Sequence, residues 1–185
     1  MSSVRIGVIV GSNSKQSINR KLAQGLMKLG AAQADWTLID ISGLPLYNRD
    51  FDGTPDFQPF EAFKAEVSRV DGVLFVTPEY NRSIPAVLKN ALDAGSRPYG
   101  QAVWNGKPVG VIGTSPGGAA TSMAQQHLRN ILANQNMPTM GQPEGFIRWS
   151  DTLVDEQGNM DAESQKFLGN YVSKLVEWVQ LHSKA

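Results

Sequence analysis

The chain has 185 residues, and its 17 lysines and arginines are balanced by 17 aspartates and glutamates, so the formal net charge is zero. This balance, without a basic stripe, argues against nucleic acid as the main partner. The chain contains no cysteine, which excludes disulfides, catalytic thiolates, thiolate zinc sites and iron–sulfur clusters. An apolar content of 41% suffices for the core of one domain over residues 1–185, without help from a metal ion.

Short β-branched runs alternate along the chain with longer stretches of helical spacing. The first run, VRIGVIV at 4–10, is almost continuously apolar, as in a strand covered on both faces. It is too short to cross a membrane and lacks the pattern of a signal peptide, so we expect a cytoplasmic protein without a membrane partner. A helix follows from about residue 17, because apolar residues recur with helical spacing at Ile18, Leu22, Leu26 and Leu29.

The alternation continues toward the C-terminus. The predicted strands are 36–41, 72–77 and 107–113, and the predicted helices are 60–70, 84–94 and 119–134. Irregular or extended chain then leads to Trp149, and a final helix carries an apolar stripe from Phe167 to Val179. Two stretches rich in Gly, Pro, Asn and Asp, at 45–59 and 95–106, are typical of long surface loops.

Strands that alternate with helices indicate βαβ units and a parallel sheet. Because crossovers are right-handed, few topologies remain, and we favour an α/β fold with a five-stranded parallel sheet of order 2-1-3-4-5. Ligands bind such sheets beyond the carboxyl ends of the strands, where the strand order reverses. A site is therefore expected among the loops after strands 1, 3 and 4.

The first of these loops, GSNSKQSIN at 11–19, crowds hydroxyl and amide side chains around the start of a helix. Helix starts bind anions through free N–H groups and the helix dipole, although simple helix capping would need only one Ser or Asn. The loop lacks the Gly-Lys-Ser/Thr end of a Walker loop and the three glycines of a dinucleotide loop, so a cofactor with one phosphate is favoured. The candidate binding residues are Gly11, Ser12, Ser14, Ser17, Ile18 and Asn19.

The second loop, TPEYNRSIP at 77–85, has a proline near each end and an aromatic ring between them. Its stiffness, its ring and its free backbone amides suit the edge and face of a flat heterocycle. An ordinary proline-bounded turn with a half-buried tyrosine and a solvated glutamate explains the pattern equally well. The candidate binding residues are Pro78, Glu79, Tyr80 and Asn81.

The third loop, GTSPGG at 113–118, matches the G-x-S-x-G letters of a hydrolase nucleophile elbow. The oxyanion hole of that elbow uses the N–H of the residue after the serine, and here this residue is Pro116, which has none. His127, in the helix that follows, is more typical of a structural histidine. The better interpretation is a small loop that lets a planar ring approach the backbone, through Ser115, Pro116 and Gly117.

These three segments, together with the LKNALD that follows the second loop and the QHLR after the third, resemble the NADPH-dependent FMN reductase family. Within that family, the chain is similar to bacterial chromate/quinone reductases and their ferric-reductase relatives. The resemblance implies a flavodoxin-like three-layer sandwich with FMN across the three loops. It places the phosphate at Ser12, Ser17 and Asn19, and the isoalloxazine ring between residues 78–81 and Ser115 with Gly117.

One departure from the family concerns the phosphate loop. The family often has Arg at the fourth position of this loop, where this chain has Ser14 followed by Lys15. Either Lys15 supplies the missing charge, or the site relies on hydroxyls and the helix dipole.

The resemblance also implies an activity. FMN would take hydride from NADH or NADPH and pass it to quinones or to other small acceptors such as chromate, ferric chelates, azo compounds or flavin. Arg82 and Arg97 are the candidate catalytic residues, for the phosphates of the nucleotide or for protonating the product, while exposed, solvated arginines are the alternative. A flavodoxin-type electron carrier without its own NAD(P)H oxidation is the competing function, and zero net charge speaks against it.

A homodimer, with a homotetramer as a further step, is the expected assembly. The flavin would lie at a sheet edge that no second domain covers, so a neighbouring subunit is expected to complete the pocket. The loop 96–104, with Tyr99 and Trp104, is placed to meet that neighbour, and Arg97 would then act in the neighbour's site. The alternative is that both aromatic residues pack on their own subunit.

Overall fold

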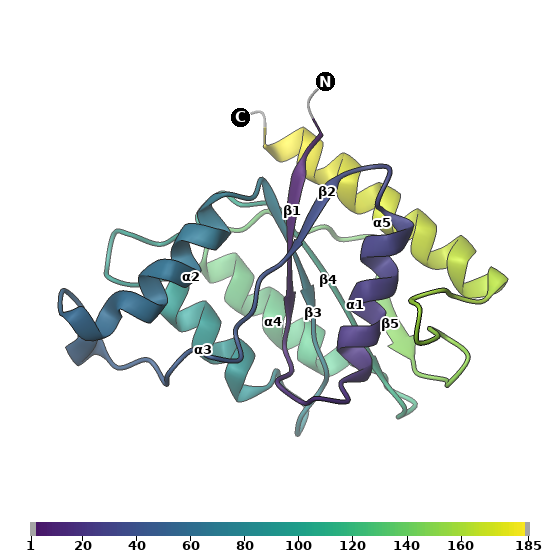
Figure 1. The fold of residues 1–185 in the computed structure, drawn as a ribbon, viewed down its shortest axis with the longest axis horizontal. Coiled ribbons are helices and arrows are strands. Elements are labelled where there is room, and N and C mark those ends of the chain that lie inside the picture. The colour runs from purple at the N-terminus through teal and green to yellow at the C-terminus, as the bar shows by residue number, and fades with distance from the viewer. Residues whose placement is uncertain (1–2, 184–185) are drawn as a thin grey trace.

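The computed structural model describes residues 3–183. Its five strands are all parallel and follow the order β2-β1-β3-β4-β5 (Figure 1). The strand bounds are Arg5–Val10 for β1, Asp35–Leu38 for β2, Gly72–Val76 for β3, Val109–Ser115 for β4 and Gly145–Arg148 for β5. This arrangement confirms the predicted fold class and strand order.

The three central strands are buried along nearly their whole length, which explains their continuous apolar sequences. Their register brings their carboxyl ends together, because Val10 pairs with Val76 and Val76 pairs with Ile112. The loops after β1, β3 and β4 therefore leave the sheet at one edge, as the strand order requires.

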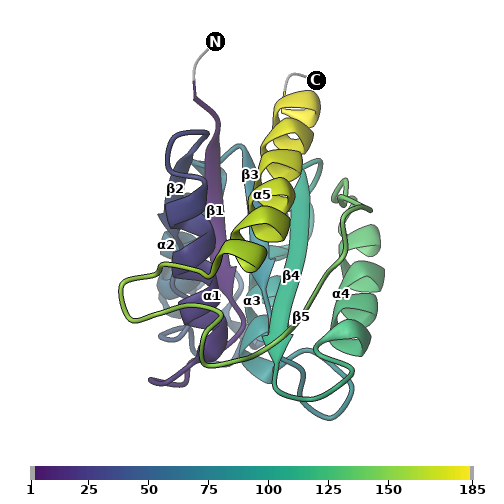
Figure 2. The same cartoon turned by 90° about the vertical axis from the view of Figure 1, so that its right-hand side faces the viewer.

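Helices cover both faces of the sheet (Figure 2). On one face lie α1 (Ile18–Leu29) and α5 (Ala162–His182), which share a core cluster with β1. On the other face lie α2 (Gln58–Ser68), α3 (Ala86–Gly95) and α4 (Ser122–Asn134), whose buried residues form a second cluster with β3. None of the helices among residues 3–183 is long and apolar enough to cross a membrane.

Most element bounds lie within three residues of the prediction, and the main differences are these. The extended chain before Trp149 contains β5, which pairs with the end of β4. The strand predicted at 36–41 is shorter and ends at Leu38. The predicted loop 45–59 contains two short 3-10 helices, η1 (Arg49–Phe51) and η2 (Pro55–Phe57), and Phe57 packs against Phe60 in a small third cluster.

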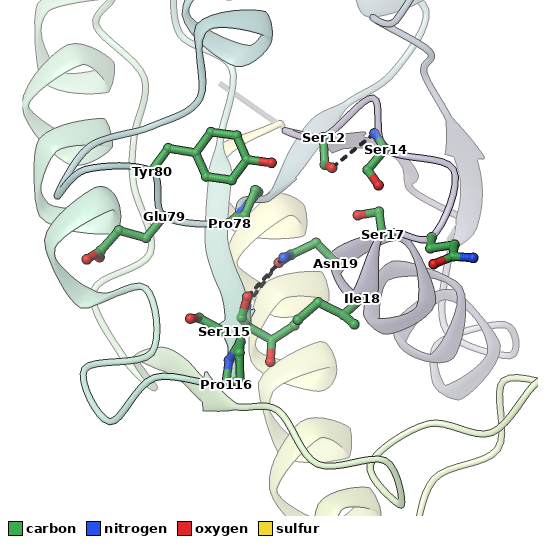
Figure 3. Close-up of a pocket in the computed structure, with 12 residues that line it drawn as sticks. Ser12, Ser14, Ser17, Ile18, Asn19, Pro78, Glu79, Tyr80, Ser115 and Pro116 are labelled. Atoms are coloured by element: carbon green, nitrogen blue, oxygen red, sulfur yellow. Dashed lines mark hydrogen bonds between the residues drawn. The ribbon is translucent and has the colours of Figure 1, made fainter.

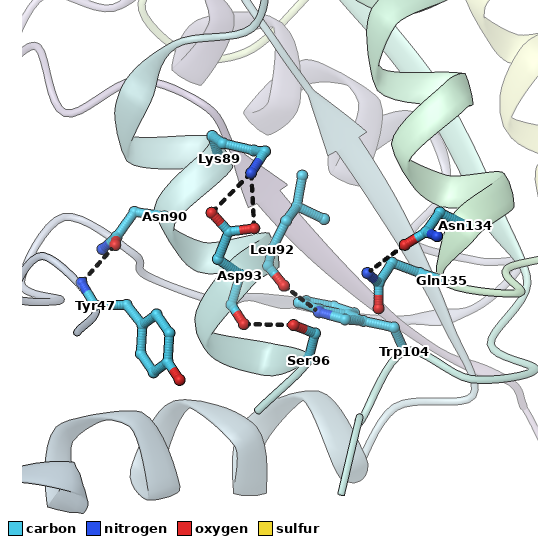
Figure 4. Close-up of polar contacts among 9 residues, drawn as sticks. All are labelled: Tyr47, Lys89, Asn90, Leu92, Asp93, Ser96, Trp104, Asn134 and Gln135. Carbon is cyan, nitrogen blue, oxygen red and sulfur yellow. Dashed lines mark hydrogen bonds and ion pairs between the residues drawn. The ribbon is translucent and has the colours of Figure 1, made fainter. Parts of the chain in front are cut away.

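The prediction that Trp104 faces a neighbouring subunit is wrong. Its indole is fully buried inside its own subunit, and Nε1 donates to the carbonyl of Leu92 at 3.0 Å (Figure 4). It packs edge-on against Phe63, and the absence of a side chain at Gly95 leaves room for its ring. Tyr99, by contrast, is 92% exposed and remains free for a contact outside its subunit.

Candidate functional site

A cavity of about 300 Å³ lies at the carboxyl edge of the sheet, where β1, β3 and β4 end. All three predicted loops contribute to its wall (Figure 3). The predicted binding residues that line it are Ser12, Ser14, Ser17, Ile18, Asn19, Pro78, Glu79, Tyr80, Ser115 and Pro116. The structure thus brings together residues that are about 100 positions apart in sequence.

Two residues line the cavity without having been predicted, and three of the predicted binding residues do not line it. Gln16 belongs to the first loop, so its polar side chain could have been included on the same grounds as its neighbours. Thr114 lies inside a buried strand, where the sequence pattern carries no sign of a site. Gly11, Asn81 and Gly117 are not among the lining residues, and their contact with a ligand stays a prediction.

Gly11 has a steric reason to be glycine. A Cβ at this position would lie 3.0 Å from Cδ2 of Leu88 and 3.2 Å from Oγ1 of Thr77. Gly113 is more constrained still, because a Cβ there would lie 2.0 Å from the carbonyl oxygen of Thr77. The close approach of the β3 and β4 ends depends on this missing side chain.

The first loop presents free donors at the start of α1. Ser17 is the N-cap residue, and its Oγ accepts from the N–H of Arg20 at 3.2 Å, so its hydroxyl hydrogen is free to donate. Within residues 3–183, no acceptor pairs with the N–H groups of Ile18 and Asn19. Ser12 and Ser17 are each only 7% exposed. Buried hydroxyls beside free N–H groups at a helix start make an anion site.

Asn19 has a second role that the sequence did not reveal. Its side chain is 1% exposed, and it bonds the backbone of Thr114 twice. Its Nδ2 donates to the Thr114 carbonyl at 2.9 Å, and its Oδ1 accepts from the Thr114 N–H at 2.9 Å. The amide oxygen and one of the two amide hydrogens are therefore already engaged within the protein.

Lys15 does not line the cavity. It lies in a second depression of about 200 Å³, on the outer side of the α1 start, with Arg20 and Lys21. Residues 155–156 form the opposite wall, and Lys21 pairs there with Glu156 at 2.7 Å. This geometry favours the second alternative for the phosphate loop, in which hydroxyls and the helix start do the binding.

The second loop contains a tight two-residue turn. The N–H of Tyr80 donates to the carbonyl of Ser83 at 2.9 Å, and the reverse bond is 3.0 Å. The central residues, Asn81 and Arg82, have φ values of 51° and 68°. Two positive φ angles are typical of a type I′ turn, a conformation that side chains other than those of Gly, Asn and Asp rarely adopt.

Glu79 joins this loop to α4. Its Oε2 accepts from the N–H groups of Met123 and Ala124, each at 3.0 Å, and so satisfies two free donors at the α4 start. The side chain is 10% exposed and points away from the cavity (Figure 3). It is therefore a helix cap rather than a solvated carboxylate, and it fixes the second loop on the sheet edge.

The candidate catalytic residues are both outside the cavity wall. Arg82 is 69% exposed and lies beside α4, with Nη1 3.1 Å from the sulfur of Met123 and 3.8 Å from Oε1 of Glu79. Arg97 is exposed and follows the far end of α3, where its carbonyl accepts a hydrogen bond from Lys64. The roles of both arginines stay predictions.

The third loop does not form a hydrolase site. Oγ of Ser115 accepts from the N–H of Gly117 at 3.3 Å. The ring of His127 is engaged elsewhere, with Nδ1 2.6 Å from Oγ of Ser83, and His182 bonds the carbonyl of Trp178. In the part of the chain that the structure describes, Ser115 thus has no histidine as a base, and no group of three acidic or histidine side chains suits a metal ion.

Comparisons with known proteins agree on one family. The model of the family described as NADPH-dependent FMN reductase matches residues 4–148. A 2-hydroxy-1,4-benzoquinone reductase of a Burkholderia species is 45% identical over 96% of this chain and 97% of its own. A quinone reductase of Pseudomonas putida is 41% identical over 96% of this chain and 95% of its own.

A solved structure is similar over the same length. The flavoenzyme FerB of Paracoccus denitrificans, an NAD(P)H:acceptor oxidoreductase, superposes with a TM-score of 0.91 at 39% identity. The match covers 97% of this chain and 98% of that chain.

Proposed function

The chain belongs to the NADPH-dependent FMN reductase family and is an FMN-dependent NAD(P)H:acceptor oxidoreductase; from this premise we propose that the cavity between its three loops is the FMN site and that quinones are its acceptors. The observation that carries the proposal is the cluster of buried hydroxyls and free N–H groups at the start of α1. We further propose that residues 1–185 form one FMN-binding domain.

The first loop fits the phosphate of FMN. The hydroxyls of Ser12 and Ser17 and the N–H groups of Ile18 and Asn19 would hold it, since each can donate and none of the N–H groups has a partner among the described residues. The positive end of α1 adds to their attraction for an anion. Among residues 3–183, no lysine or arginine lines this cavity, so the phosphate would be held by neutral donors.

The other two loops fit a flat ring. Pro78 and Pro116 both line the cavity, where they have no N–H that would need a partner and their rings offer apolar surface. Tyr80 is 57% exposed and points from the second loop toward the first (Figure 3). Ser115 is half-buried and presents a hydroxyl to the same space. When bound there, FMN would supply two-electron chemistry that no side chain of this protein provides.

Quinones are supported as acceptors by the reductases that are 45% and 41% identical to this chain. Chromate, ferric chelates and azo compounds are further acceptors that an exposed flavin site would admit. The match to the family model favours an enzyme over a flavodoxin-type electron carrier. We place the enzyme in the cytoplasm, where cells keep their NAD(P)H.

We also propose a homodimer that completes the cavity. Tyr99 and Leu46 are exposed to 92% and 81%, so both side chains are free to contact a partner subunit. In such an assembly Arg97 would act in the cavity of the partner subunit, which reconciles its distance from its own cavity with the predicted role. Pairing of dimers into a homotetramer would follow at higher concentration.

Anaerobic stopped-flow absorbance tests the function. Purified, FMN-loaded protein is mixed with NADH or NADPH, and 2-hydroxy-1,4-benzoquinone, unsubstituted benzoquinone or chromate is added in a second mix. We expect the flavin absorbance to bleach with at least one nucleotide and to return rapidly with the quinones. Absence of bleaching with both nucleotides would leave only the electron-carrier function, and bleaching without recovery on quinone would exclude quinones as acceptors.

A further inference from the structure

Near its end, the backbone of β4 is hydrogen-bonded by a side chain at the position that a continuation of β3 would otherwise occupy. The last bond of the β3–β4 ladder runs from the N–H of Thr77 to the carbonyl of Ile112 at 2.9 Å. Beyond it the second loop leaves the sheet, yet β4 continues to Ser115. Both backbone groups of Thr114 are bonded to one amide side chain, that of Asn19 (dashed lines in Figure 3).

This pairing satisfies groups that would be costly to leave free. Thr114 is fully buried, and a buried N–H or C=O without a partner is strongly unfavourable. The side chain of Asn19 offers a donor and an acceptor side by side, as a peptide group of a neighbouring strand does. It therefore acts as a short substitute for the next residues of β3.

The same pairing connects two walls of the cavity. Asn19 belongs to the first turn of α1, where the free N–H groups lie, and Thr114 is followed directly by Ser115 and Pro116 of the third loop. Among the hydrogen bonds of residues 3–183, these two are the only ones that join the segment 11–19 to the segment 113–118. One side chain thus supplies all the hydrogen bonds between these two walls in the described part of the chain.

We propose that Asn19 is a positioning residue that holds the third loop at a fixed distance from the phosphate site, so that it controls the fit of the whole flavin rather than recognition of its phosphate. This inference rests on the proposed FMN site. It assigns different tasks to two neighbours in sequence: the free hydroxyl hydrogen of Ser17 faces the phosphate, and the engaged amide of Asn19 sets the spacing.

Comparing FMN with riboflavin separates these tasks, because riboflavin lacks the phosphate. Apoprotein of the wild type, Asn19→Ala and Ser17→Ala is titrated with each flavin and followed by fluorescence. Asn19→Ala should weaken both flavins by the same factor, about tenfold or more, because Thr114 loses two buried bonds. Ser17→Ala should weaken FMN alone. If Asn19→Ala weakens FMN and leaves riboflavin unchanged, Asn19 is a phosphate ligand and the inference is wrong.

The visible circular dichroism of the bound FMN provides a readout that a loss of stability would not change. A shifted third loop alters the surroundings of the ring, so the spectrum should change in Asn19→Ala and stay as in the wild type in Ser17→Ala. An unchanged spectrum in Asn19→Ala, at saturating FMN, would show that Asn19 only stabilises the fold and would overturn the inference.

Two further measurements test the pairing without bound flavin and with a second variant. Hydrogen exchange in the apoprotein should show the Thr114 amide protected in the wild type and unprotected in Asn19→Ala. Equal protection in both would refute the pairing of Asn19 with Thr114. This result is independent of flavin, so a wild type that binds no flavin would refute the proposed function alone. If Asn19→Ala does not fold, Asn19→Asp keeps only the acceptor for Thr114, and its riboflavin affinity should still fall; an unchanged affinity would refute the inference.

Discussion

Removing the hydroxyl of Ser17 should separate the stability of α1 from the affinity of the cavity for phosphate. Oγ of Ser17 accepts from the N–H of Arg20 at 3.2 Å, and the same group lines the cavity with 7% of the residue exposed. Ser17→Ala therefore removes an N-cap and a phosphate donor in one step.

The two losses differ in size. An N-cap lost to alanine costs about 1 kcal/mol of unfolding free energy. A hydrogen bond to a charged group contributes about 1.5 to 3 kcal/mol, so FMN affinity should fall roughly ten- to a hundredfold or somewhat more. Riboflavin affinity should change little, since that flavin has no phosphate and the other walls of the cavity are untouched.

Isothermal titration of apoprotein with FMN and riboflavin measures the affinities, and urea unfolding measures the stability. Asp161→Ala is a matched control, because Asp161 caps α5 by accepting from the N–H of Ser164 at 2.9 Å, outside the cavity wall. It should lose stability and keep its FMN affinity. Equal weakening of FMN and riboflavin by Ser17→Ala would show that the first loop is not the phosphate site.

Four other predictions concern core packing, assembly, acid stability and chemistry. Trp104→Ala should lower the unfolding free energy by about 3 to 5 kcal/mol in urea titrations because it empties a buried site, whereas a change below about 1 kcal/mol would contradict the packing. Tyr99→Ala should leave subunit stability within about 0.5 kcal/mol but shift sedimentation from a dimer toward the 20.1 kDa monomer; a variant that stays dimeric excludes this loop from the interface. The hydrogen bond from Arg5 holds the pKa of Asp71 below its usual range, so the pair stabilises the fold above about pH 4 and this contribution is lost as acid protonates the carboxylate. Asp71→Asn should thus make urea stability depend less steeply on pH in the acid range, and an unchanged acid dependence would argue against the ion pair. The wild type should have no esterase activity for Ser115→Ala to remove. If the wild type hydrolyses an activated ester and Ser115→Ala abolishes this hydrolysis, the hydrolase interpretation is restored.

The fold followed from local sequence because its main signals are local. Continuous apolar runs such as 4–10 predicted buried strands, and helical spacing predicted the segments between them. β5 was only foreseen as irregular or extended chain, since the four residues GFIR are too few to show a period. What makes this segment a strand is its pairing with β4 and a hydrogen bond from Gln125 to the Gly145 carbonyl at 2.8 Å, neither of which its own sequence records.

The site was predictable to the same extent. Each loop could be recognised from its own composition, so most residues of the cavity wall were predicted. The use of individual side chains was not, because it depends on partners that are distant in the chain. Asn19 bonds a residue 95 positions away, and Glu79 caps a helix 44 positions away. The burial of Trp104 was missed for a related reason, since its loop folds back onto α3 and β3.

The turn at Asn81 and Arg82 limits how the second loop can be redesigned. Both residues have positive φ, so the backbone itself restricts which side chains fit, and Gly, Asn and Asp are the amino acids that tolerate this region. A library that randomises these two codons would return many destabilised variants, whose altered activity would say little about acceptor choice. Tyr80, exposed at the cavity and outside the left-handed region, is the better position at which to vary the acceptor range.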